Sequence, residues 1–182
     1  MLSSQFDLLF YDRQSGFTVS RWLDDLQTRY GGIDAALVWP HYPNIGADNR
    51  NQFDMMRALP GGLDAVTSFT AELNKSGVKV LWPYIEWDVG TRREEGWNPV
   101  GSDNVAEDAK TMVRLLQQIG GVGVNGDSLP FVPEVFWDAS VDAGYPLALQ
   151  AEGGTRDPAL RWSTILNRGC GGGPERSPLY LL

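Results

Sequence analysis

Residues 78–88 read VKVLWPYIEWD, a short apolar segment whose last residues turn aromatic and then acidic. Residues 35–42 (AALVWPHY) and 122–127 (VGVNGD) follow the same design, and a loop and a helical pattern come after each stretch. The Trp-Pro pair that begins at Trp39 recurs at Trp82, 43 residues later. This spacing is about the length of one βαβ step. The sequence therefore predicts repeated βα units with parallel strands.

The segments around these strands show the matching helical pattern. Apolar residues recur at helical spacing in three segments that glycine ends: residues 17–30, 61–75 and 104–119. A fourth strand is expected at residues 146–151, after a shorter helix around residues 133–143. One more helix is expected from residue 157 to residue 166.

The length of the chain limits how much of a barrel it can hold. A complete eight-unit barrel usually needs about 250 residues, and this chain has 182. We predict an α/β fold, a partial TIM (β/α)8 barrel with parallel strands over residues 1–168. Residues 169–182 (GCGGGPERSPLYLL) carry no periodic apolar pattern and are expected to be disordered. An open barrel would leave a strand edge exposed, which makes a homodimer an alternative to a fragment.

Composition excludes several classes of partner. The formal net charge of −8 and a pI near 4.6 argue against nucleic acid or an anionic membrane surface. One cysteine, Cys170, and one histidine, His41, allow neither an internal disulfide nor a His-rich zinc site. The first residues read neither as a signal peptide nor as a membrane span, so a soluble chain is expected. No glycine-rich phosphate loop or dinucleotide fingerprint follows a strand, and no cofactor or metal is expected.

Polar and aromatic residues collect where the predicted strands end, which is where the chemistry of such folds gathers. Strand alternation separates Leu81, Pro83 and Ile85 from Trp82, Tyr84, Glu86 and Asp88. If neighbouring strands pair at an offset of 43 residues, residues of the other strands share a face with Trp82, Tyr84, Glu86 and Asp88. These are Trp39 and His41, Asn125 and Asp127, and, from the fourth strand, Gln150 and Glu152.

A pair of carboxylates suggests glycosidic bond cleavage, because one can act as nucleophile or base and the other as acid. Asp127 and Glu152 are the catalytic candidates. Asp127 can instead cap a helix or close a turn, and Glu152 can be a solvated loop residue. Flat aromatic rings suit sugar rings. The candidate substrate-binding residues are Trp39, His41, Tyr42, Asn44, Asp48, Arg50, Trp82, Tyr84, Trp87, Asp88, Arg92 and Asn125.

The succession LWPYIEWD, GVNGDS and LALQAEGG resembles the third, fourth and fifth βα units of α-galactosidase-type (melibiase-like) (β/α)8 glycoside hydrolases. The resemblance covers residues 33–154. It implies that Asp127 is the nucleophile of a retaining mechanism and that Glu152, Gly153 and Gly154 form the loop after the fifth strand. The general acid of that family lies at the end of the sixth strand, and the sequence after Asp157 predicts no such strand.

Three functional hypotheses remain open at this stage. The first is a glycoside hydrolase domain, or a fragment of one, that acts on a carbohydrate substrate. The second is a non-catalytic carbohydrate-binding module or pseudoenzyme that keeps the aromatic residues without the acid. The third is another barrel enzyme, such as a lyase or aldolase, although neither Lys79 nor Lys110 is placed for Schiff-base chemistry.

Overall fold

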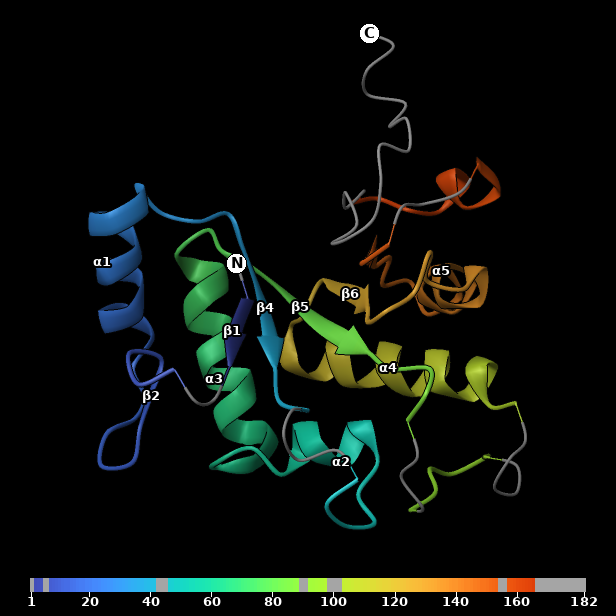
Figure 1. The fold of residues 1–182 in the computed structure, drawn as a ribbon, viewed down its shortest axis with the longest axis horizontal. Coiled ribbons are helices and arrows are strands. Elements are labelled where there is room, and N and C mark those ends of the chain that lie inside the picture. Colours follow the sequence, from blue (N-terminus) through green and yellow to red (C-terminus); the bar gives the residue numbers. More distant parts are fainter. Residues whose placement is uncertain are drawn as a thin grey trace, which may run out of the picture.

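The computed structural model describes residues 2–4, 7–41, 46–88, 92–97, 103–153 and 157–165. Within these residues, five parallel strands form one sheet in the order β1-β4-β5-β6-β7. The strands are β1 (Leu2–Ser4), β4 (Ala35–Trp39), β5 (Lys79–Tyr84), β6 (Gly123–Gly126) and β7 (Ala148–Ala151). Their order in space equals their order in the chain (Figure 1). This singly wound order is that of a (β/α) barrel, since a doubly wound sheet reverses direction at its centre.

The helices between the strands lie where the apolar spacing predicts them. They are α1 (Val19–Tyr30), α3 (Gly62–Lys75), α4 (Val105–Ile119) and α5 (Glu134–Asp142). Gly31 and Gly120, with φ of 78° and 76°, end α1 and α4 in the left-handed conformation that glycine adopts without strain. The predicted alternation of strands and helices is therefore confirmed for all four predicted strands.

The sheet has two different faces. The helices pack on one face, here called the helix face, where they contribute Trp22, Phe69, Leu116 and Phe136 to the core. Four strands contribute to the same core. Their residues are Ala36, Val38, Val80, Trp82, Tyr84, Val124 and Leu149. Paired residues of parallel strands point to the same side, so the intervening residues point to the other. This second face, here called the site face, carries Trp39, Leu81, Pro83, Asn125 and Gln150.

The prediction that Trp82 and Tyr84 share a face with Asn125 is wrong. Leu37 pairs with Leu81, a register of 44 residues instead of the 43 that the Trp-Pro repeat suggests. The extra residue turns Trp82 and Tyr84 to the helix face, because a slip of one residue reverses every side chain of a strand. A Cβ atom added to Gly121 would lie 3.3 Å from the Trp82 indole, which shows how closely that ring is packed.

Several elements go beyond the prediction. They are β1, the hairpin β2 (Tyr11–Asp12) and β3 (Gly16–Phe17), and α2 (Gln52–Arg57) within the loop expected after β4. The helix expected from residue 157 to residue 166 is instead a 3₁₀ helix, η1 (Asp157–Arg161). Ile165 then forms a parallel bridge with Gln150 at the edge of β7 that faces away from β6, the position of a sixth strand. Residues 166–182, with the predicted tail, lie outside the described residues.

Helix α2 lies beyond the arrowhead of β4, at the carboxyl end of the sheet (Figure 1). A capping box fixes its start. The Asn51 side chain accepts a hydrogen bond from the Asp54 backbone N–H at 2.8 Å, and the Asp54 carboxylate accepts one from the Asn51 N–H at 3.3 Å. Such reciprocal bonds satisfy backbone donors that the first helical turn leaves open.

Candidate functional site

Two adjacent strands bring polar side chains together on the site face. Asn125 of β6 donates a hydrogen bond from Nδ2 to Oε1 of Gln150 on β7 at 3.3 Å. Asp127 follows β6 and is 4% exposed, and alternation directs it to the side of Asn125. Glu152 follows β7, and its backbone N–H donates to the Gly126 carbonyl at 3.3 Å, which extends the pairing of these strands to their ends. The two catalytic candidates therefore come from adjacent strand ends.

The turn after β6 holds a residue in a rare conformation. Ser128 has a φ of 57°, the one positive φ among the described residues other than glycine. A non-glycine residue pays about 1–2 kcal/mol for this left-handed region. The Ser128 N–H donates to Glu152 Oε2 at 2.6 Å, and the Gly153 N–H donates to the Leu129 carbonyl at 2.9 Å. The end of β7 thus holds the turn that carries Asp127.

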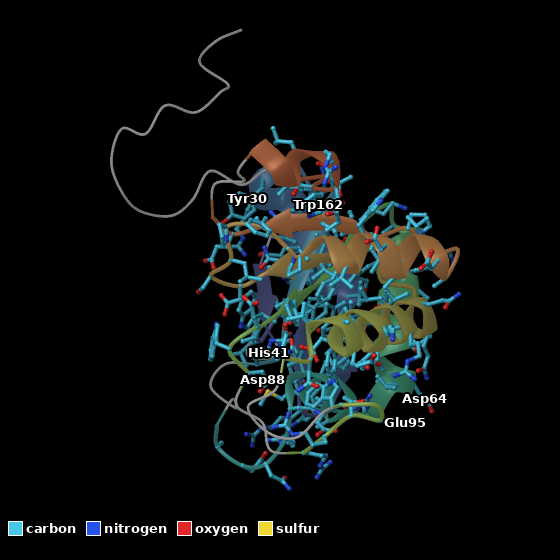
Figure 2. All side chains as sticks on the ribbon, turned by 90° about the vertical axis from the view of Figure 1, so that its right-hand side faces the viewer. Tyr30, His41, Asp64, Asp88, Glu95 and Trp162 are labelled. Carbon is cyan, nitrogen blue, oxygen red and sulfur yellow. The ribbon has the colours of Figure 1, made fainter. Side chains whose placement is uncertain are left out.

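A second group of polar contacts joins His41, Gln52 and Asp88. His41 Nε2 lies 3.3 Å from the Gln52 carbonyl, while the Gln52 N–H donates to Asp88 Oδ2 at 2.7 Å. The Gln52 amide also bonds both ways with the Ile85 backbone, at 2.8 and 2.9 Å. Figure 2 shows His41 and Asp88 together, away from Tyr30 at the opposite end of the strands. These contacts tie the loops after β4 and β5 together.

His41 is a neutral side chain within this group. Burial lowers its pKa to about 4, and the bond with the Gln52 carbonyl opposes that shift only in part. Within the described structure its Nδ1 has no hydrogen-bond partner although it is buried. Trp39 packs edge-on against the imidazole with ring centres 6.2 Å apart. Trp39 itself is partly exposed on the site face.

Charged residues of α2 and of the loops near it form ion pairs. Asp48 and Arg50 bond one another at 2.9 Å within one exposed turn, and Arg92 Nε lies 3.4 Å from Asp54. Glu94 makes a two-pronged contact with Arg57, at 2.7 and 3.0 Å. Sequence reasoning missed Glu94 and Arg57, because only the fold brings residues 37 positions apart together.

Tyr84 belongs to the helix face and to a different polar contact. Its hydroxyl lies 2.9 Å from Asp108 Oδ2 of α4, and its ring packs against Phe136 with centres 4.5 Å apart. Burial raises the pKa of the Asp108 carboxyl to about 6, with the hydrogen bond from Tyr84 opposing the rise and the charges of Asp88 and Asp103 adding to it. Tyr84 and Trp82 are thus core residues, which corrects their place among the substrate-binding candidates.

The remaining candidates have different positions. Trp87 is 43% exposed in the turn after β5. Tyr42 and Asn44 lie outside the described residues. Across the described part of the chain, no helix is both long and apolar enough to cross a membrane.

The sequence matches no protein-family model, and no curated protein is significantly similar to it. Solved structures resemble the fold. A noncanonic maltogenic α-amylase, AmyB from Thermotoga neapolitana, aligns with 84% of this chain at 16% identity and a TM-score of 0.51, over 45% of its own length. A β-arabinopyranosidase aligns with 89% of this chain at 18% identity and a TM-score of 0.48, over 24% of its length. A point mutant of MutB aligns with 84% at 13% identity and a TM-score of 0.48, over 44%.

The chain spans less than half the length of each of these structures. The likeness to the α-amylase agrees with the singly wound order of the strands. The chain therefore has an α/β fold that corresponds to part of a (β/α)8 barrel.

Proposed function

We propose that this chain carries the nucleophile-bearing part of a retaining glycoside hydrolase, with Asp127 as the nucleophile. The observation that carries the proposal is the position of Asp127. It is a buried carboxylate at the carboxyl end of β6, beside Asn125 and next to the strand end that bears Glu152. In barrels of this kind the catalytic groups come from the carboxyl ends of the strands.

The proposed reaction has two displacements. A carboxylate oxygen of Asp127 forms a bond to the anomeric carbon while the bond from that carbon to the leaving oxygen breaks, and an acid protonates the leaving oxygen. Water then attacks the glycosyl-enzyme ester and releases the sugar and the carboxylate. Trp39, which is partly exposed on the site face, would offer an apolar surface to the sugar ring.

One observation favours a second candidate, a carbohydrate-binding module without turnover. Among the described residues, Ile165 alone bridges to the edge of β7 away from β6, where it pairs with Gln150, and it offers no acid there. Without an acid to protonate the leaving oxygen, the rate falls by about 100- to 10,000-fold. Trp39 and the amide side chains of Asn125 and Gln150 would then bind sugar without cleaving it.

The test compares the parent chain with Asp127→Asn. Asparagine keeps the shape of the side chain and removes the nucleophilic charge, so turnover of 4-nitrophenyl α- and β-pyranosides should fall by about 10,000-fold or more. Calorimetric affinity for the corresponding free sugar should stay within about threefold. The control is Asp24→Asn, which changes an exposed aspartate of α1 and should leave both quantities unchanged.

The outcomes separate the two candidates. Unchanged turnover in Asp127→Asn would contradict the assignment of the nucleophile and direct attention to Asp88. Sugar binding without turnover in the parent would favour the binding module. Neither turnover nor binding in the parent would overturn both proposals.

A further inference from the structure

Glu152 is the second carboxylate of the candidate site, and one of its two oxygens is bound to the neighbouring turn. Its Oε2 accepts a hydrogen bond from the Ser128 backbone N–H at 2.6 Å. A backbone N–H can only donate, so this oxygen must act as an acceptor. The backbone of the same strand end also binds the turn, through Glu152 N–H to Gly126 and Gly153 N–H to Leu129.

The partner of Glu152 is the residue directly after Asp127. Ser128 has a φ of 57°, a conformation that local sequence does not favour and that the surroundings must impose. The neighbouring turn residues are fixed as well: the Asp127 N–H donates to the Tyr84 carbonyl at 2.8 Å. The two peptides that flank Asp127 are therefore both held: the preceding one binds β5 through the Asp127 N–H, and the following one binds Glu152 after β7 through the Ser128 N–H.

We propose that Glu152 is a positioning residue, whose carboxylate fixes the Asp127–Ser128 peptide and through it the direction of the Asp127 side chain. This inference rests on the proposed function, in which Asp127 is the nucleophile. It assigns the protonation of the leaving group to another residue. An error of about 1 Å in the place of a reacting group can cost 100-fold in rate, so an anchor of this kind matters for turnover.

Two substitutions separate an anchor from an acid. Glu152→Gln keeps a carbonyl oxygen for the Ser128 N–H, and kcat should stay within about threefold of the parent. Glu152→Ala removes the acceptor, and kcat should fall by about 100-fold with KM little changed. That loss should be equal for 4-nitrophenyl and methyl glycosides, and the pH profile should keep its shape. Glu72→Ala, an exposed change on α3, is the control.

An acid would behave differently. If Glu152 were the acid, Glu152→Gln and Glu152→Ala would lose turnover equally. The loss would be greater for methyl than for nitrophenyl glycosides, and the alkaline limb of the pH profile would disappear. This result would overturn the inference. A rise in KM alone in both variants would also overturn it, because it would make Glu152 a substrate contact.

A second measurement does not depend on activity, so it tests the anchor even if the parent hydrolyses nothing. Hydrogen exchange of the Ser128 amide, followed by NMR, should be slow in the parent and in Glu152→Gln and at least about tenfold faster in Glu152→Ala. Exchange at Leu73 in the core of α3 should be the same in all three proteins, which shows that they are folded. Equal Ser128 exchange in all three would overturn the inference.

Discussion

Ser128 shows how a single residue can store strain beside a candidate active site. Its N–H is held by Glu152, and its left-handed backbone follows directly after Asp127. Strained residues of this kind persist only where the surrounding structure determines them, and they cluster at functional sites. The strain at Ser128 is therefore consistent with a turn that places Asp127 at a cost in stability.

Substitutions at Ser128 should rank by their tolerance of a positive φ. Ser128→Gly should raise the free energy of unfolding by about 0.5–1 kcal/mol, because glycine adopts this conformation without strain. Ser128→Val should lower it by about 1–3 kcal/mol, because a β-branched side chain clashes there. Urea unfolding of the three proteins measures the ranking. A valine variant as stable as the parent would contradict the left-handed assignment.

Some single residues could be predicted from the sequence and others could not. The segment GVNGD placed Asp127 at a strand end, because an apolar strand that stops at polar turn residues is a local pattern. The Arg57–Glu94 pair and the burial of His41 depend on how α2 meets the loops after β4 and β5. The conformation of Ser128 was equally hidden, since serine has no local preference for a positive φ.

At the scale of elements, strands and helices were predictable but the register between strands was not. The helices follow from apolar spacing that one segment carries alone, whereas register depends on the neighbouring strand. The Trp-Pro repeat suggested 43 residues, and the sheet pairs β4 with β5 at 44. Short elements such as β1 and α2 were missed because three to six residues carry too little periodicity.

The corrected register predicts opposite effects for the two tryptophans. Trp82→Ala should lower the free energy of unfolding by about 3–5 kcal/mol, because a fully buried ring leaves a cavity in the core. Trp39→Ala should cost little stability and weaken sugar binding by about five- to tenfold, since Trp39 is partly exposed on the site face. Urea unfolding and calorimetric titration measure the two effects. A stable Trp82→Ala variant with impaired sugar binding would contradict the 44-residue register and support the 43-residue register of the Trp-Pro repeat.

At the scale of the whole molecule, two buried groups make opposite contributions to stability as the pH changes. The pKa of His41 is lowered from 6.5 to about 4, so the unfolded chain binds more protons and stability rises between pH 4 and pH 6.5. The pKa of Asp108 is raised from 3.8 to about 6, so the folded chain binds more protons and stability falls between pH 4 and pH 6. Each effect is on the order of 3 kcal/mol.

Because the two contributions have opposite signs over nearly the same range, they should largely cancel in the parent chain. Removing one group should therefore expose the other. Asp108→Asn should become more stable by on the order of 3 kcal/mol as the pH rises from 4 to 6, relative to the parent's own change. His41→Gln should become less stable by a similar amount over the same interval. The comparison uses slopes, so any constant cost of the substitution itself drops out.

Urea unfolding at pH 4, 5, 6 and 7 measures these slopes, with Asp24→Asn as the control that should follow the parent. The double variant should again show the flat profile of the parent, because both titrating groups are then absent. The same sign of slope in the two single variants would contradict the opposed burial of His41 and Asp108. A steep parent profile matched by the double variant would assign the pH dependence to other groups, such as Glu94, whose pKa is lowered beside Arg57 and Asn51. The pH dependence of the free energy of unfolding therefore reports on both His41, near the site face, and Asp108, on the helix face.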